Sequence, residues 1–96
     1  MALTIIATIK AKADQVELVK NELQKLAEQT HAKDEGCIDY VVHQDNEAAM
    51  LFVVYENWAS EALLQKHSNS EHFQAFMKAT ETGTEEFTVN TMTRIA

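Results

Sequence analysis

The sequence predicts an α+β fold of the ferredoxin-like kind, in which a four-stranded antiparallel sheet carries its helices on one face. Two observations lead to this expectation. Four segments alternate in side-chain character with the period of two that a strand requires, and the segments between them repeat apolar residues at helical spacing. The resulting order is βαββαβ with the second helix broken in two, which is the order of a ferredoxin-like plait.

The first strand is followed directly by the first helix. Residues 3–11 (LTIIATIKA) alternate and are rich in β-branched side chains, which favours a strand. Asp14 and Glu17 have the spacing of a capping box, so we expect a helix to begin there and to end near residues 31–33, before Gly36. The buried stripe of this helix should consist of Val16, Val19, Leu23, Leu26 and Thr30.

A β-hairpin is expected after the first helix. Residues 37–44 (CIDYVVHQ) and residues 48–57 (AAMLFVVYEN) both have strong strand propensity. The residues between them, Asp45, Asn46 and Glu47, are typical of turns. Because this connection is short, the two strands should pair in antiparallel fashion.

The broken helix and the last strand complete the plait. Ser60 is the expected N-cap of a short helix, and Ser68 with Glu71 forms a second capping box that opens the next helix. That helix should bury four residues at positions i, i+3, i+4 and i+7, which are Phe73, Phe76, Met77 and Thr80. Residues 86–95 (EFTVNTMTRI) alternate as the fourth strand.

Length and charge restrict the kind of protein. A chain of 96 residues makes one domain, so residues 1–96 are treated as a single unit. The formal net charge of −7 argues against partners with phosphate backbones and against anionic membrane surfaces. No apolar run approaches the roughly 18 residues of a membrane span, and the first residues lack a signal-peptide pattern, which predicts a cytoplasmic protein.

Two common kinds of site are excluded by composition. Cys37 is the only cysteine, so neither an internal disulfide nor a zinc site built from CxxC pairs can form. Gly36 and Gly83 are the only glycines, and neither belongs to a glycine-rich phosphate loop. Nucleotide binding through a P-loop or a dinucleotide fingerprint is therefore excluded.

The second face of the predicted sheet also requires a cover. Two helices cover one face of a four-stranded sheet, yet both alternating sets of residues in the first and third strands contain apolar side chains. An exposed apolar face of this size is typical of an interaction surface, and a second copy of the chain is the simplest partner. We therefore expect a homodimer with the sheets facing each other.

Three short segments carry a family resemblance. Residues 35–40 (EGCIDY) lead into the second strand, and residues 55–58 (YENW) and 67–73 (HSNSEHF) flank the short helix. The first segment resembles the E-G-C-x-x-Y pattern of the antibiotic biosynthesis monooxygenase (ABM) family. The other two resemble the E-x-W and H-x(4)-H-[FY] signature of that family, and the resemblance covers nearly the whole chain.

The resemblance implies a dimeric α+β barrel and a short list of activities. The family includes cofactor-independent monooxygenases of anthrone-type polyketides and quinols, heme-degrading enzymes, and an isomerase of phosphorylated autoinducer-2. The quinol-monooxygenase and autoinducer-processing branches resemble this chain most, because both keep the two histidines. The heme-degrading branch does not match, since its Asn, Trp and His would fall near Ala7, at His67 and near Met77.

The expected catalytic residues are His67, Glu56 and His72. The resemblance favours His67 as a general base, with Glu56 orienting its ring. The plainer interpretations are that one histidine packs near the helix break while the other is solvated, and that Glu56 reaches water or accepts hydrogen bonds from a neighbouring strand. The two histidines are five residues apart, a poor spacing for sharing one metal, so neither a metal nor a cofactor is expected.

The expected substrate pocket lies between the helices and the sheet. Its candidate lining residues, several of which are first of all core residues, are Trp58, Tyr40, Asn57, Phe52, Phe73, Phe76 and Met77. An aromatic pocket with one base suits a monooxygenase that oxidises a small quinol or anthrone-like hydroxy-aromatic with O2 and without a cofactor. The alternatives are an isomerase of a small, phosphorylated or unphosphorylated hydroxy-ketone, and a non-catalytic module that binds a small ligand or heme.

Overall fold

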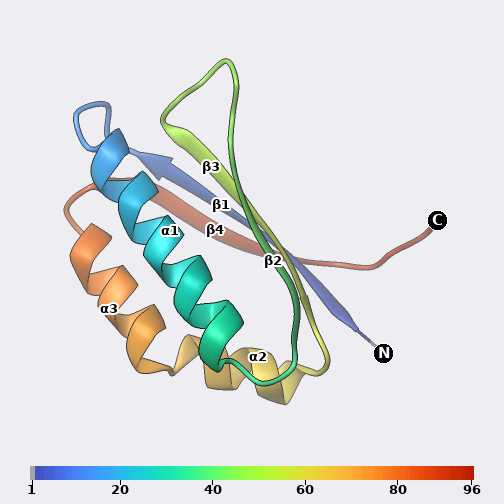
Figure 1. Cartoon of the computed structure of the whole chain (residues 1–96). Coiled ribbons are helices and arrows are strands. Elements are labelled where there is room, and N and C mark those ends of the chain that lie inside the picture. The colour runs from blue at the N-terminus through green and yellow to red at the C-terminus, as the bar shows by residue number, and fades with distance from the viewer. Residues whose placement is uncertain (1) are drawn as a thin grey trace.

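The computed structural model describes residues 2–96, and its elements follow the predicted order (Figure 1). The strands are β1 (Leu3–Ala11), β2 (Cys37–Gln44), β3 (Leu51–Trp58) and β4 (Thr84–Met92). The helices are α1 (Val16–Lys33), α2 (Glu61–Ser68) and α3 (Glu71–Thr80). The predicted α+β class and the ferredoxin-like order are therefore confirmed.

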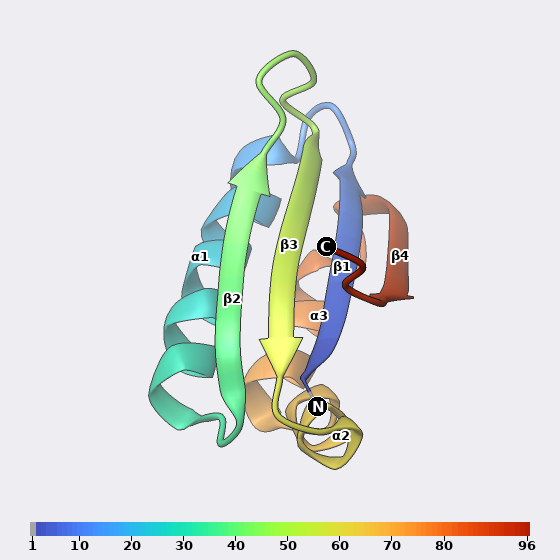
Figure 2. The same cartoon turned by 90° about the vertical axis from the view of Figure 1, so that its right-hand side faces the viewer.

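The four strands form one antiparallel sheet in the order β2-β3-β1-β4. Figure 2 shows this order face-on, with α1 and α3 behind one face and α2 at the lower end of the sheet. Leu3 pairs with Trp58 and Ile5 with Glu56, while Cys37 on β2 pairs with Trp58 from the other side. This register places Glu56 and Trp58 at the end of the sheet next to α2.

The turn between β2 and β3 is longer than predicted, because a side chain hydrogen-bonds to its backbone. Asp45 Oδ1 accepts hydrogen bonds from the backbone N–H groups of Glu47 and Ala48, both over 2.8 Å. The N–H of Leu51 then donates to the carbonyl of Ala48 over 2.9 Å. Pairing in β3 consequently begins at Leu51 and not at Ala48. The fourth strand likewise begins and ends earlier than expected, at 84 and 92.

One of the three predicted helix caps is confirmed. Ser60 accepts a hydrogen bond from the backbone N–H of Leu63 and caps α2 as expected. The prediction for α3 was wrong, because Ser70 and not Ser68 is its N-cap, while Ser68 is the last residue of α2. The prediction for α1 was also wrong: the helix begins at Val16, and the N-cap position makes no side-chain hydrogen bond.

The core lies between the inner face of the sheet and the apolar stripes of the helices. Helix α1 buries Val19, Leu23, Leu26 and Thr30, four of the five residues predicted for its stripe. Helix α3 buries Phe76 and Thr80, but Met77 is 37% exposed, which corrects its predicted burial. Within residues 2–96, no helix has the length and apolar character that a membrane span requires.

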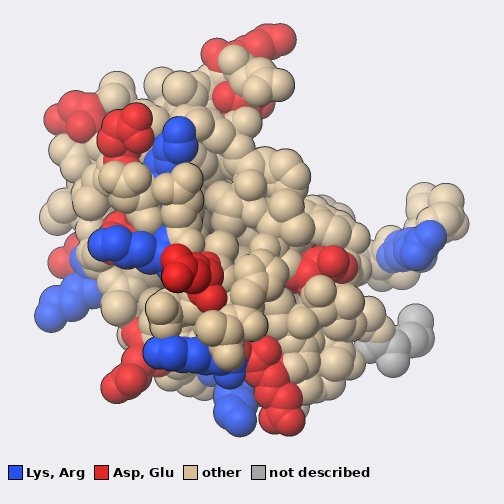
Figure 3. All heavy atoms as spheres, in the orientation of Figure 1, with Lys and Arg blue, Asp and Glu red and all other residues tan. Residues whose placement is uncertain are grey.

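The outer face of the sheet is uncovered in the monomer and is partly apolar. Val41, Tyr55 and Met92 on this face are 44%, 40% and 46% exposed. Charged side chains gather mainly over the helices and the hairpin tip, and few lie over the part of the sheet visible in Figure 3. The side-chain amide of Asn57 on this face is held by two hydrogen bonds. It donates to Asp39 Oδ2 over 2.9 Å and to the hydroxyl of Tyr55 over 2.8 Å.

Candidate active site

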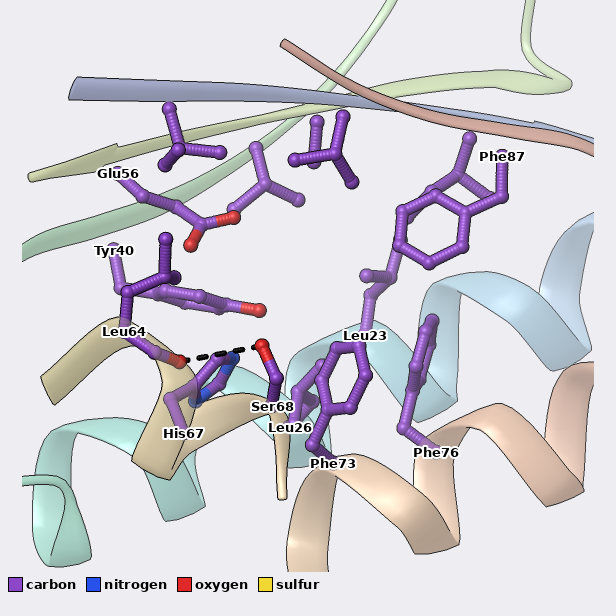
Figure 4. Close-up of a pocket in the computed structure, with 15 residues that line it drawn as sticks. Leu23, Leu26, Tyr40, Glu56, Leu64, His67, Ser68, Phe73, Phe76 and Phe87 are labelled. Atoms are coloured by element: carbon purple, nitrogen blue, oxygen red, sulfur yellow. Dashed lines mark hydrogen bonds between the residues drawn. The ribbon is translucent and has the colours of Figure 1, made fainter. Parts of the chain in front are cut away.

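A small cavity of about 50 Å³ lies between the inner face of the sheet and the helices (Figure 4). Its polar groups come from Tyr40 on β2, Glu56 on β3, and His67 and Ser68 on α2. Aliphatic side chains and phenylalanines from the surrounding strands and helices form the other walls. None of the lining residues found in the described chain is a lysine or arginine. The cavity is thus apolar, with a few polar groups that converge at one end.

His67 lies in the last turn of α2 and is 3% exposed. Its ring nitrogen Nδ1 is 2.5 Å from Asp34 Oδ2, a hydrogen-bond distance. An ionised carboxylate only accepts, so the hydrogen of this pair belongs to Nδ1. In that neutral ring Nε2 keeps its lone pair, and the hydrogen bond found for the ring within residues 2–96 is the one at Nδ1. Burial lowers the pKa of His67, although Asp34 opposes that effect.

His72 binds the same carboxylate oxygen from the other side. This residue lies in the first turn of α3, and its Nε2 is 2.9 Å from Asp34 Oδ2. It does not line the cavity but faces a groove of about 370 Å³ between α1 and α3. Asp34 therefore joins the two imidazoles, and only the ring of His67 reaches the cavity.

Asp34 is the functional candidate that sequence reasoning missed. It is the residue directly after α1, and its backbone N–H donates to the carbonyl of Thr30 over 3.0 Å. In the sequence it looks like an ordinary solvated acid before Gly36. One signal was present, because a negative charge at a helix C-terminus is unfavourable to the helix dipole and therefore calls for a compensating donor. The two histidines supply that compensation.

Glu56 lies on the inner face of β3 and is 5% exposed. Its Oε1 accepts a hydrogen bond from the indole N–H of Trp58 over 2.9 Å. Burial raises the pKa of Glu56 to about 7, and the bond from Trp58 opposes the rise. The expectation that Glu56 orients His67 was wrong, because the ring nitrogen of His67 is held by Asp34. Glu56 is instead a separate acid–base group in the cavity wall.

Tyr40 stands between these two groups. Its ring is buried and makes edge contacts with the rings of His67 and Trp58, at centroid separations of 5.4 and 6.3 Å. In Figure 4 its hydroxyl points toward the middle of the cavity. Burial, followed by the nearby charge of Glu56, raises the pKa of this hydroxyl well above its usual range. Tyr40 is therefore a neutral hydrogen-bonding group in the cavity.

The predicted lining residues divide into two groups. Tyr40, Phe73 and Phe76 line the cavity as expected. The other four, which are Trp58, Phe52, Asn57 and Met77, do not. Trp58 and Phe52 are buried in the core, and Trp58 packs on His67 with ring centroids 4.7 Å apart.

Asn57 and Met77 point away from the cavity, for different reasons. Successive residues of β3 alternate between faces, so Asn57 lies on the outer face between the inward-facing Glu56 and Trp58. Met77 lies on the exposed side of α3 and borders a separate hollow beside β4. Neither residue can contact a ligand in the cavity without a change of fold.

The expected poor geometry for a shared metal was also wrong. One nitrogen each from His67 and His72 and one carboxylate oxygen of Asp34 all lie within 4.8 Å of one another. The two histidines belong to different helices, as the sequence predicts, and the break between α2 and α3 turns both rings toward Asp34. Within residues 2–96, these three side chains are close enough together to hold one metal ion.

Comparison with known proteins finds chains that are similar to this one in sequence and in fold. The Bacillus subtilis (strain 168) protein YcnE, whose name is that of a monooxygenase, is 32% identical over 71 residues, 74% of each chain. The crystal structure of PA3566 from Pseudomonas aeruginosa matches with a TM-score of 0.93 and 35% identity, covering 99% of this chain and 95% of that one. A conserved protein from Methanosarcina mazei Go1 matches with a TM-score of 0.86 and 30% identity, covering 96% and 91%.

The family assignment follows from the sequence model of the family as well as from these relatives. Residues 2–79 match the model described as antibiotic biosynthesis monooxygenase. This range includes β1, the hairpin, α2, and Asp34, Glu56, His67 and His72. The chain therefore belongs to the antibiotic biosynthesis monooxygenase family.

Proposed function

We propose that this protein is a cofactor-independent monooxygenase that oxidises a small hydroxy-aromatic compound of the quinol class with O2. The observation that carries the proposal is the Asp34–His67 pair, which leaves the unprotonated Nε2 of a buried imidazole beside an apolar cavity. Membership of the family supports oxygen chemistry. The phenylalanine-rich walls support a flat, mostly apolar substrate.

His67 acts as the general base in this proposal. Asp34 holds the hydrogen on Nδ1, so Nε2 accepts the phenolic proton of the substrate. The phenolate that results passes one electron to O2, which gives a substrate radical and superoxide. These two combine to form a carbon–oxygen bond in a peroxide. The apolar walls exclude water, and they hold the anion and oxygen together.

Glu56 supplies the proton for the second half of the reaction. With a pKa raised to about 7, it is largely protonated below neutral pH and can donate to the departing oxygen of the hydroperoxide. The peroxide first takes back the proton held by His67 and becomes the hydroperoxide. When its O–O bond breaks, the outer oxygen leaves as water with the proton of Glu56, while the ring carbon loses its hydrogen as a proton and forms a C=O bond with the oxygen that stays. This proton restores the acid form of Glu56. A hydroquinone and O2 thus give a hydroxyquinone and water, with all electrons supplied by the substrate.

The size of the cavity favours a single ring over three fused rings. A cavity of roughly 150 Å³ holds benzene, whereas the cavity beside His67 measures about 50 Å³. A monocyclic quinol therefore requires side chains at the mouth to move, and the partly buried Leu64 and Phe73 are the candidates. A tricyclic anthrone requires a much larger displacement of the buried core. We accordingly propose a monocyclic quinol as the substrate class.

Oxygen consumption by chelator-treated protein tests the proposal. The panel contains hydroquinones, naphthalenediols and anthrones, measured with an oxygen electrode. We expect uptake with the single-ring compounds and a loss of about 10²–10⁴ in rate for His67→Ala, because the base is removed. Lys66→Ala, an exposed change one residue away on the same helix, should leave the rate unchanged.

Two outcomes contradict the proposal. An unchanged rate in His67→Ala would remove the imidazole from the chemistry. An absence of oxygen uptake across the panel would remove monooxygenation of these substrates. Both variants should show the circular dichroism spectrum of the parent chain, which separates a catalytic effect from a loss of folding.

A second candidate function is isomerisation of a small, unphosphorylated hydroxy-ketone. The observation that favours it is the presence of two acid–base groups, His67 and Glu56, on one small cavity. Such a pair can move a proton between adjacent carbons through an enediol. The lining residues include no lysine or arginine to hold a phosphate. Turnover of a hydroxy-ketone under nitrogen distinguishes this function from the first.

The proposal includes a homodimer that pairs the outer faces of two sheets. Its support is the partly apolar outer face, on which Val41, Tyr55 and Met92 are exposed. Light scattering coupled to size-exclusion chromatography should give twice the chain mass for the parent and a smaller mass for Val41→Glu. Met77→Glu introduces the same charge on an exposed side chain of α3 and should leave the mass unchanged. Equal masses for both variants and the parent would refute this interface.

A further inference from the structure

We propose that Asp34, His67 and His72 bind one divalent transition-metal ion of the zinc type. The site is distinct from the cavity, because two of its three ligands, Asp34 and His72, do not line the cavity. Two imidazole nitrogens approach one carboxylate oxygen from different helices, at 2.5 and 2.9 Å. The three ligand atoms lie within 4.8 Å of one another.

The arrangement requires little change to accept an ion. In the structure each imidazole places an N–H where a metal would lie, so an ion replaces hydrogen rather than a packed side chain. Tetrahedral zinc with ligands at 2.0–2.2 Å keeps them about 3.4 Å apart. The carboxylate of Asp34 must therefore withdraw by less than about 1 Å from each ring. The two ring nitrogens lie within 4.8 Å of each other and must also approach to about 3.4 Å, which requires a rotation of the His72 ring as well as of the Asp34 side chain.

The chemistry of the ligands selects the kind of ion. Imidazole suits zinc, copper, iron and nickel, whereas magnesium and calcium prefer sites made only of oxygen. Two histidines and one carboxylate leave at least one coordination position open. A water molecule or a small anion can complete the shell from the adjacent groove, which His72 lines.

The ligands are held by backbone contacts that do not depend on the ion. Ser70 donates its hydroxyl hydrogen to the carbonyl of His67 over 2.6 Å and accepts from the N–H of Phe73. This pair of bonds fixes the break between α2 and α3 and so directs both imidazoles to one point. The N–H of Asp34 is anchored on the carbonyl of Thr30. Such preorganisation lowers the entropy lost on binding.

An entry path leads to the site from the surface. The side chains of His72 and Asp34 are each about one tenth exposed, at 11% and 10%. The groove of about 370 Å³ that His72 lines opens between α1 and α3. Its charged residues are Glu22, Glu28 and Glu71 together with Lys25 and Lys33. The acids outnumber the lysines, so the rim favours a cation.

Metal binding would reverse the role of His67 in the cavity. If the metal takes the lone pair of Nδ1, the neutral ring carries its hydrogen on Nε2. The nitrogen that faces the cavity then donates a hydrogen bond and cannot accept a proton. This part of the inference rests on the proposed function, and it predicts that a bound ion inhibits oxygen uptake.

The test begins with binding alone, so it does not require a known substrate. Chelator-stripped full-length protein is titrated with ZnCl2 by isothermal calorimetry, and with CoCl2 by visible absorption. We expect one ion per chain with a Kd in the micromolar range or tighter, and the intense visible bands of four-coordinate cobalt. Asp34→Asn and His72→Gln should each weaken binding at least tenfold. His43→Gln, an exposed histidine outside the group, should bind like the parent.

The zinc-binding measurements can overturn the site in two ways. The absence of one-to-one binding by the parent overturns the site, as does unchanged binding by His72→Gln. His72→Gln is the main variant because its side chain lies at the surface end of the group, and circular dichroism verifies that it folds. If oxygen uptake is found, one equivalent of zinc should slow it and a chelator should restore it. Stoichiometric zinc without inhibition overturns only the coupling to His67, whereas binding without any uptake counts against the proposed function and not against the site.

Discussion

Replacement of Glu56 by glutamine tests how strongly the fold opposes ionisation in the cavity wall. Glu56 is 5% exposed, and its burial raises the pKa from an ordinary 4.5 to about 7. The folded state therefore prefers the protonated carboxyl. The corresponding stability is fully present below pH 4.5 and is lost as the pH rises through 7.

The size of the effect follows from these two values. A change from 4.5 to about 7, at 1.36 kcal/mol per pH unit, corresponds to about 3.4 kcal/mol when Glu56 is fully ionised. Roughly 0.8 kcal/mol of this is already lost at pH 5, where the unfolded carboxyl is largely ionised. Between pH 5 and pH 8 the ionisation of Glu56 should therefore remove about 2.5 kcal/mol from the free energy of unfolding.

Urea unfolding of the parent and of Glu56→Gln at pH 5 and pH 8 measures this quantity. The amide cannot ionise, and its oxygen can still accept from the indole of Trp58. All other titrating groups contribute equally to the free energy of unfolding of both proteins, so they cancel when one value is subtracted from the other. Relative to the parent, Glu56→Gln should gain about 2.5 kcal/mol in the free energy of unfolding between pH 5 and pH 8. A fixed protein concentration is required, because association stabilises by mass action.

Glu61→Gln is the matched control for Glu56→Gln. Glu61→Gln changes an exposed glutamate of α2 and should follow the pH dependence of the parent. If the free energy of unfolding of Glu56→Gln shows the same pH dependence as that of the parent, the carboxyl of Glu56 ionises in the fold as easily as in water. The argument for Glu56 as a proton donor near neutral pH would then fail.

Three further predictions concern stability and are measured by urea unfolding at pH 7. Ser70→Ala removes the N-cap of α3 and should cost about 1 kcal/mol, whereas Ser68→Ala should change stability by less than about 0.5 kcal/mol. Gly36→Ala should cost more than about 1 kcal/mol, because Gly36 has φ +81° and an added Cβ would overlap Leu63. Thr30→Val should stabilise by about 1 kcal/mol, since the buried hydroxyl of Thr30 has no hydrogen-bond partner within residues 2–96. Equal losses for the two serines, a neutral Gly36→Ala or a destabilised Thr30→Val would each contradict the corresponding geometry.

The strands were predictable from local pattern, because alternation is a property of neighbouring residues. The bounds of β1 and β2 agree with those read from the sequence. The start of β3 was placed too early because Ala48 has no side chain that signals a turn, and the side chain of Asp45 acts three residues away. Ser68 and Ser70 satisfy similar local rules for capping, so only the observed bond to Phe73 identifies the true cap.

The candidate site was predictable only in part, since its contacts join distant segments. His67 and Glu56 stand out in the sequence through the family signature and through a carboxylate in an apolar strand. Asp34 lies 33 residues before His67 and 38 before His72, and nothing local connects it to either. Met77 has the right spacing for burial, but its side of α3 borders the hollow beside β4, and the residue is 37% exposed.

The strand order of the sheet has a consequence for the time course of folding. β1 is made before the other strands, yet it lies inside the sheet, where Leu3 pairs with Trp58 and Thr4 with Met92. Both ladders close very long loops, so the contact order is high and folding should be slow for a chain of this size. Until β4 emerges from the ribosome, one β-branched edge of β1 stays unpaired and can be captured by another chain. The chain is therefore most open to mispairing in the interval between synthesis of β1 and closure of the sheet.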